Sequence, residues 1–130
     1  MMNKTMLIGR LTSAPEISKT TNDKSYVRVT LAVNRRFKNE KGEREADFIS
    51  IIIWGKSAEN LVSYAKKGSL ISIEGEIRTR NYTDKQNQKH YVTEILGLSY
   101  DLLESRATIA LRESAIKTEE TLLDAEELPF

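Results

Sequence analysis

The segment Tyr26–Asn34 constrains the fold of this chain more than any other, because its apolar and polar residues alternate strictly. The apolar positions are Val27, Val29, Leu31 and Val33. A period of two is typical of a β-strand that buries one face against a core. We therefore expect a sheet protein whose core lies against the valine face of this strand.

Four further segments have the composition of strands, and one segment between them has that of a helix. Strands are predicted at Asn3–Leu11, Asp47–Trp54, Leu70–Arg80 and His90–Leu98, with a bulge or bend at Gly75. The polar stretches 37–46 and 82–89 are predicted to be hairpin connections, the first with its turn at Lys41-Gly42. A helix is predicted over Ser57–Lys67, with Ser57 as N-cap, Leu61, Tyr64 and Ala65 as the buried stripe, and Gly68 as the left-handed stop.

Three strands, a helix and two strands follow one another in the order of the OB-fold, although periodicity alone also allows another small β-barrel. The expected class is all-β: a five-stranded Greek-key barrel of OB type with one helix between strands 3 and 4, plus a flexible acidic C-terminal tail. The length of 130 residues suits one domain. We expect the barrel over residues 1–104, a short mobile linker over 105–123 and an acidic tip over 124–130.

Charge is distributed unevenly along the chain. Residues 1–100 contain 17 Lys and Arg against 11 Asp and Glu, whereas residues 101–130 contain 3 against 8. A basic body with an acidic end indicates a polyanionic ligand for the body and a different partner for the tail. A merely solvated tail on an ordinary body is the alternative.

Enzyme motifs are missing from the sequence. There is no cysteine, and the single histidine, His90, stands beside a basic loop without a partner for catalysis or metal binding. The run Gly55-Lys56-Ser57 resembles the end of a phosphate-binding loop, but strand residues precede it where that motif needs glycine. We expect no catalytic activity or metal site, and no membrane segment or signal peptide. The absence of cysteine fits a reducing cytoplasm.

Four aromatic residues stand close to cations at the ends of predicted strands: Phe37, Phe48, Trp54 and Tyr82. Nucleic acid requires this combination, because cations contact phosphates and aromatic faces stack on bases of any sequence. Core or rim packing is the alternative for each ring. The candidate phosphate contacts are Arg10, Arg28, Arg35, Arg36, Lys56, Lys67, Arg78 and Arg80.

Parity along the strands assigns these rings to one surface. Phe48 and Trp54 share the face of their strand opposite to Ile49, Ile51 and Ile53, which we expect in the core. On the fourth strand, Ile71 and Ile73 are expected to point inward, and so is Ile77 unless Gly75 resets the alternation. Arg78, Arg80 and Tyr82 are expected to point outward. The sequence therefore predicts a stacking platform with charged edges.

Several runs resemble the bacterial single-stranded DNA-binding protein family over about residues 3–100. These runs are Met6-Leu7-Ile8-Gly9-Arg10-Leu11, Ala14-Pro15-Glu16, Trp54-Gly55-Lys56, Lys67-Gly68-Ser69 and Ile73-Glu74-Gly75-Glu76-Ile77-Arg78-Thr79-Arg80. The stacking aromatics of that family fall on Phe37, Phe48, Trp54 and Tyr82. The resemblance also implies a homotetramer, no catalysis and no cofactor, and a nucleoid-associated cytoplasmic protein.

The C-terminal tip is similar to the acidic tip of that family, by which partner enzymes are recruited. It comprises Asp124, Glu126, Glu127, Leu128, Pro129 and Phe130. The family's long Gly-, Gln- and Pro-rich linker is missing, and Phe37, Phe48 and Tyr82 stand where tryptophan is common. This shortened form resembles the second paralogue of Gram-positive bacteria, which protects incoming DNA during natural transformation.

The sequence thus favours sequence-independent single-stranded DNA binding and protection in replication, recombination, repair or natural transformation. An RNA-binding or replication-restart OB-fold protein remains an alternative, as does a protein-interaction adaptor that binds no nucleic acid. Replication, recombination and repair proteins are the expected partners of the tip.

Overall fold

The computed structural model describes residues 1–105, 107, 108 and 110–115. Its elements are β1 (Thr5–Leu11), β2 (Ile17–Lys19), β3 (Ser25–Lys38), β4 (Arg44–Trp54), α1 (Lys56–Tyr64), β5 (Leu70–Thr83) and β6 (Lys89–Leu102). Residues 107, 108 and 110–115 have helical backbone. Within the described part of the chain, no helix combines the length and apolar character that a membrane span requires.

Five of the strands close into a barrel. The sheet order is β1-β5-β6-β4-β3, and β1 returns to β3 through the pairs Arg10–Ala32 and Leu11–Leu31. All pairings are antiparallel except β4 with β6, where Ile51 and Ile52 lie opposite Ile95 and Leu96. The helix lies between the third and fourth barrel strands, as predicted, and the OB-fold is confirmed; β2 is a short addition at the edge of β3.

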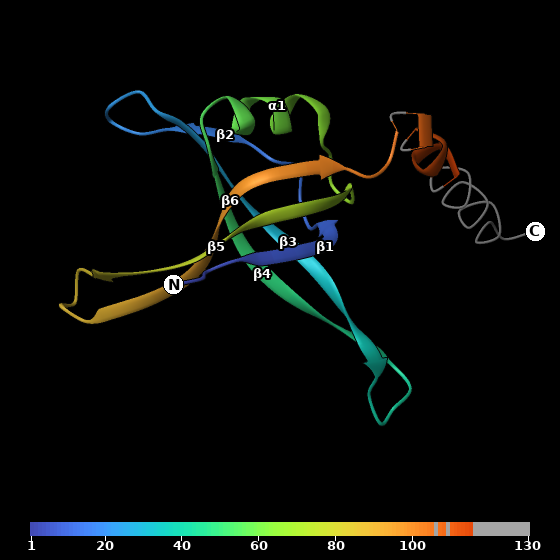
Figure 1. The fold of residues 1–130 in the computed structure, drawn as a ribbon, viewed down its shortest axis with the longest axis horizontal. Coiled ribbons are helices and arrows are strands. Elements are labelled where there is room, and N and C mark those ends of the chain that lie inside the picture. The colour runs from blue at the N-terminus through green and yellow to red at the C-terminus, as the bar shows by residue number, and fades with distance from the viewer. Residues whose placement is uncertain (106, 109, 116–130) are drawn as a thin grey trace, which may run out of the picture.

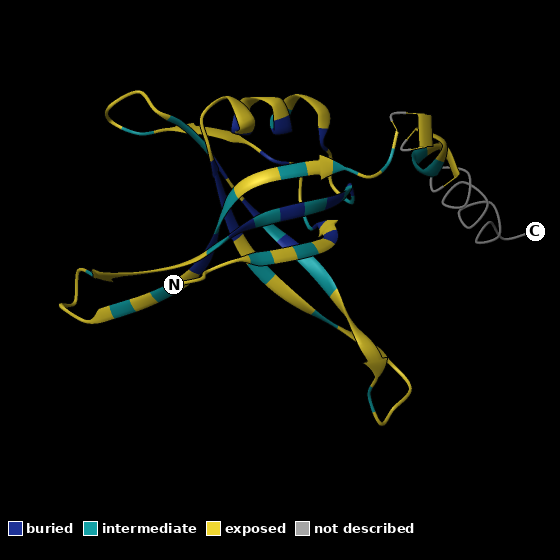
Figure 2. Ribbon diagram, in the orientation of Figure 1, coloured by how far each residue is buried: buried dark blue, intermediate teal, exposed yellow. Residues whose placement is uncertain are grey.

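The core is formed by the inward residues that alternation predicts. Val27, Val29, Leu31, Ile51 and Ile53 are buried with residues of β1, β5, β6 and α1. In Figure 2 the buried residues lie in the middle of the barrel, while the two long hairpins, β3–β4 and β5–β6, project from it with exposed residues on both faces (Figures 1 and 2). These projecting arms explain why β3, β4 and β5 are longer than predicted, because strand segments beyond the core have no apolar face from which to predict them. Strand β6 is extended mainly at its barrel end, where residues 99–102 pair with β5.

The register of β5 against β6 shifts where the sequence predicts a bulge. Glu74 pairs with Ser99 but Gly75 pairs with Gly97, so Leu98 is the extra residue. A Cβ at Gly75 would lie 2.1 Å from the carbonyl oxygen of Leu96. Any other residue would therefore clash with the backbone of β6, so this position requires glycine. Ile77 does not join the core that alternation without a reset at Gly75 predicts: it is half exposed, because β5 has left the barrel there.

Helix α1 differs from its prediction at both ends. Gly55 is the N-cap, with φ 71°, and Ser57 lies inside the first turn, so the predicted Ser57 cap is wrong. The helix ends at Tyr64, which is half exposed rather than buried, because Ala65 turns into extended backbone and takes the buried position. Gly68 has the predicted positive φ, in the turn that leads to β5.

Candidate nucleic-acid interface

A hollow of about 340 Å³ opens on the outer face of the barrel where four strands meet. It is lined by Arg28 of β3, Ile52 and Trp54 of β4, Arg78, Thr79 and Arg80 of β5, and Glu94 and Leu96 of β6. The strand register creates it, because Arg28 lies opposite Ile52 and Ile52 lies opposite Leu96. Arginines from two strands that are distant in sequence, β3 and β5, therefore line the same hollow as Trp54.

Trp54 presents a ring that is 41% exposed at the edge of this hollow. Its other side is supported by Tyr26, the residue opposite it on β3, with ring centroids 5.1 Å apart and ring planes 41° apart. Ile52, two residues earlier on the same face, is buried and forms part of the hollow's lining. A ring that is supported from behind and open in front can stack on a base without rearranging.

The other predicted aromatics lie on the barrel face and on the two arms. Phe48 is 69% exposed on β4, on the face of Trp54 as parity predicts. Phe37 is 83% exposed and belongs to β3, although it was predicted to lie in a loop; the β3–β4 register shifts between Asn34 and Lys38 around it. Tyr82 lies on the β5–β6 arm, stacked on His90 with centroids 5.0 Å apart.

Most of the predicted phosphate contacts already hold acidic partners. Arg28 and Arg80 both bind Glu94, and Arg78 binds Glu76 at 2.8 Å. Each of the three guanidinium groups lines the hollow with roughly half of its side chain exposed, so each retains N–H groups that face solvent. The surface of the hollow therefore carries both cationic and acidic side chains and is not a purely basic patch.

Arg35 and Arg10 are engaged outside the hollow. Arg35 donates to Asp47 at 2.9 Å and to Glu45 at 2.9 Å. The hydrogen bond from Arg35 lowers the pKa of the Asp47 carboxyl below its ordinary value, and the same bond raises the pKa of Arg35. Arg10 donates to Glu104, at 2.9 Å, and to the carbonyl of Gly68.

Glu104 connects the end of β6 to the helical residues that follow. It accepts hydrogen bonds from Arg112, Arg10 and the backbone N–H of Leu70. The bond from Arg112, the largest influence, lowers the pKa of Glu104 below its ordinary value. Arg10 is thus part of a structural ion-pair cluster beside the tail.

Three predicted cations, Arg36, Lys56 and Lys67, form no ion pair with any residue that the structure describes. They lie apart from one another: Arg36 on the β3–β4 arm, Lys56 at the start of α1 and Lys67 in the turn after it. Their charges are available to an anion.

Sequence reasoning missed Glu94 and Tyr26. Glu94 is buried although it is charged, and its two arginine partners are 66 and 14 residues away. Alternation with Val27 placed Tyr26 on the outer face of its strand. That Tyr26 lies beside Trp54 follows only from the β3–β4 register, which the sequence does not reveal. Both residues acquire their roles from pairing between distant strands.

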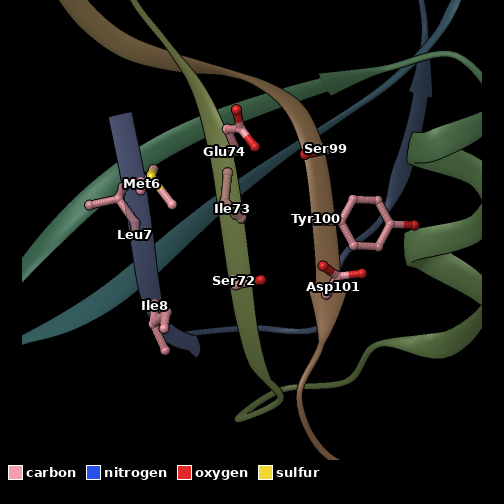
Figure 3. A pocket seen from close by; sticks show the side chains of 9 residues that line it. All are labelled: Met6, Leu7, Ile8, Ser72, Ile73, Glu74, Ser99, Tyr100 and Asp101. Carbon is pink, nitrogen blue, oxygen red and sulfur yellow. The ribbon is translucent and has the colours of Figure 1, made fainter. Parts of the chain in front are cut away.

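A second hollow lies on the outer side of β1, β5 and β6, as Figure 3 shows. Met6 and Ile8 project from β1 there and are 74% and 59% exposed. Across β5, Glu74 and Ser72 lie beside them, whereas Tyr100 of β6 points toward α1 and donates to the carbonyl of Ser57 (Figure 3). One edge of β1 pairs with β5, and the other edge pairs with β3 only at Arg10 and Leu11. The rest of this other edge has no partner strand among the described residues.

The predicted tip, comprising Asp124, Glu126, Glu127, Leu128, Pro129 and Phe130, lies outside the described residues. Within them, no three His, Cys, Asp or Glu side chains are grouped so that they could hold a metal ion.

Comparison with known proteins places this geometry in context. Residues 2–103 match the model of the single-strand binding protein family. The chain is 58% identical to single-stranded DNA-binding protein 1 of Streptococcus pyogenes serotype M6 and 57% identical to single-stranded DNA-binding protein 2 of Streptococcus agalactiae serotype V, in both cases over the full length of both chains. It is also 52% identical to single-stranded DNA-binding protein 1 of the latter strain, over 83% of this chain and 66% of that protein.

Proposed function

This chain belongs to the single-strand binding protein family, and we propose that it binds single-stranded DNA without sequence preference across the outer face of its barrel. The observation that carries the proposal is the hollow that Trp54 lines together with Arg28, Arg78 and Arg80. A base stacks on the indole while the arginines contact the adjoining phosphates. The protein acts by binding alone, without catalysis.

The path of the strand follows the exposed aromatic rings. Phe48 continues the surface of Trp54 along β4, and Phe37 and Tyr82 extend it onto the two arms. Stacking requires only the π-face that every base has, so the site accepts any sequence. Duplex DNA is excluded, because its bases are already stacked on one another and offer no free faces.

Fluorescence titration with oligo-dT, oligo-rU and duplex DNA at several salt concentrations tests this proposal. We expect oligo-dT to bind most tightly, with an affinity that falls as salt rises. Preference for oligo-rU would identify an RNA-binding protein instead. Absence of salt-dependent binding to any of the three would indicate a protein-interaction adaptor.

We further propose that the protein is a homotetramer. The unpaired part of the β1 edge and the exposed side chains of Met6 and Ile8 lie together on one face (Figure 3). Pairing between subunits would satisfy the strand edge and bury these side chains. Light scattering is expected to give about four chain masses, and a monomer at micromolar concentration would refute this assembly.

The C-terminal tip is proposed to recruit replication, recombination and repair proteins. Its acids are repelled by DNA, and a large apolar ring such as Phe130 adds nothing to solubility. A docking motif accounts for both, since Phe130 fills an apolar pocket, the acids meet a basic rim and Pro129 restricts the backbone beforehand. Deleting Phe130 is expected to abolish capture of genome-maintenance enzymes and to leave oligo-dT affinity unchanged; the reverse pattern would rule out the docking role.

We also propose that this short form serves natural transformation, in the cytoplasm and at the nucleoid, where single strands enter. This chain aligns with the full length of single-stranded DNA-binding protein 2 of Streptococcus agalactiae serotype V, but with only two thirds of single-stranded DNA-binding protein 1 of the same strain. Loss of the gene is then expected to lower transformation frequency without slowing growth. A growth defect with normal transformation would instead assign it to replication.

A further inference from the structure

Glu94 is the only buried carboxylate among the described residues, and it lies in a surface that is otherwise suited to anions. Its side chain is 7% exposed and projects from β6 into the hollow beside Trp54. An acid at this position opposes the negative charge of DNA. Its presence therefore requires an explanation beyond the stacking platform.

The two carboxylate oxygens of Glu94 hold two different arginines. Oε2 accepts from Nη1 of Arg28 at 2.6 Å, and Oε1 accepts from Nε of Arg80 at 3.3 Å. A buried carboxylate that loses its partners is left uncompensated in a region of low dielectric, which is strongly unfavourable. Glu94 therefore ties both arginines to one buried point of the barrel.

Each arginine is held on a second side by an aromatic ring. The guanidinium of Arg28 lies 5.9 Å from the ring centroid of Tyr26, which supports Trp54. That of Arg80 lies 5.9 Å from the ring centroid of Tyr82. A continuous series of contacts thus runs from Trp54 to Tyr82, the two proposed stacking residues, with Glu94 at its centre.

The anchored arginines remain able to bind an anion. In each pair with Glu94 only one guanidinium nitrogen donates, and 44% of the Arg28 side chain and 45% of the Arg80 side chain are exposed. A guanidinium has five N–H groups in a rigid fork, so an arginine anchored through one nitrogen still presents the others to phosphate.

We propose that Glu94 is a positioning residue for single-stranded DNA: its buried carboxylate fixes Arg28 and Arg80 so that their free N–H groups meet phosphates between the bases stacked on Trp54 and Tyr82. This inference rests on the proposed function. Long arginine side chains lose conformational freedom when they bind, and Glu94 removes that loss in advance.

An opposite role for Glu94 makes an opposite prediction. If the carboxylate merely competed with phosphate for the two arginines, its neutralisation would tighten DNA binding. If it positions them, its neutralisation weakens binding although the site becomes more positive. The sign of the change therefore separates the two roles.

The test compares Glu94→Gln with Glu76→Gln, a matched control. Glu76 also faces a lining arginine, Arg78, at 2.8 Å, but it is 33% exposed and holds no second arginine among the residues that the structure describes. Affinities for fluorescein-labelled oligo-dT are measured by anisotropy from low to high salt, with the full chain. We expect about tenfold weaker binding for Glu94→Gln, against unchanged or tighter binding for Glu76→Gln.

Equal or tighter binding by a folded Glu94→Gln protein would overturn the proposal, and so would equal losses in both variants. Should Glu94→Gln fail to fold, as circular dichroism would reveal, Glu94→Asp retains the buried charge but is one methylene too short to reach both arginines. It is expected to bind at least threefold more weakly, and wild-type affinity would overturn the proposal. Failure of the wild type to bind oligo-dT would instead refute the proposed function.

Discussion

Replacing Trp54 by alanine removes the ring on which the hollow depends. Stacking of one base on an aromatic side chain contributes about 1–3 kcal/mol, so oligo-dT affinity should fall about fivefold to 150-fold. Because the ring is 41% exposed, only part of it contributes to folding. At about 25 cal/mol per Å² of buried apolar surface, we expect the free energy of unfolding to fall by about 2 kcal/mol, which leaves the barrel folded.

The assay uses the fact that Trp54 is the only tryptophan of the chain. In the wild type, a stacked base quenches its emission, and saturation of the quenching reports binding at this ring. For Trp54→Ala, anisotropy of labelled oligo-dT replaces the intrinsic signal, and urea denaturation measures stability. Tyr64→Ala is the control, since Tyr64 is a half-exposed aromatic on α1, outside the hollow.

Three results would refute the reasoning about Trp54. Unquenched emission at saturating oligo-dT would mean that no base reaches the ring. Full wild-type affinity in Trp54→Ala would mean that the strand passes elsewhere. An equal loss in Tyr64→Ala would show that the effect is not specific to the hollow.

Three further predictions follow from other contacts. Arg36→Ala should make the slope of log affinity against log salt shallower by about 0.7, and Arg35→Ala by less, because acids already neutralise Arg35; equal changes measured by anisotropy would contradict this. The lowered pKa of Glu104 stabilises the fold above the ordinary value of 4.5, and this contribution is lost as the pH falls through the lowered pKa; thermal unfolding should therefore depend less on pH in Glu104→Gln. Gly75→Ala places a Cβ 2.1 Å from a backbone oxygen and should cost about 1–3 kcal/mol or more by urea denaturation, with wild-type stability as the contrary result.

The barrel could be predicted because its information is local. Alternation in Tyr26–Asn34 and the isoleucines of β4 identify which faces are buried, and both are confirmed. The same parity placed Phe48 and Trp54 outside, where their exposure is confirmed. Strand β2 could not be predicted, since its three residues are all exposed and carry no pattern.

The ends of elements and the ion pairs depend on distant residues. Helix α1 ends early because the core takes Ala65 in extended form, which propensity does not reveal. Arg28 was assigned to phosphate from its neighbours in sequence, but its ion pair is with Glu94, 66 residues away. A sequence shows where cations are, whereas only the strand register shows which acids they meet.

The paired arginines change what the basic surface contributes to DNA binding. Glu94 with its two arginines carries a net charge of +1, and Arg78 with Glu76 is neutral. If all eight predicted cations acted independently, the slope of log affinity against log salt would be about −5.6 per subunit. With paired groups counted by net charge, the three free cations and the Glu94 cluster give about −3. The surface therefore contributes to DNA binding more by the fixed positions of its arginines than by its net charge. A DNA strand that is held by stacking and by few net ion pairs can still dissociate and move.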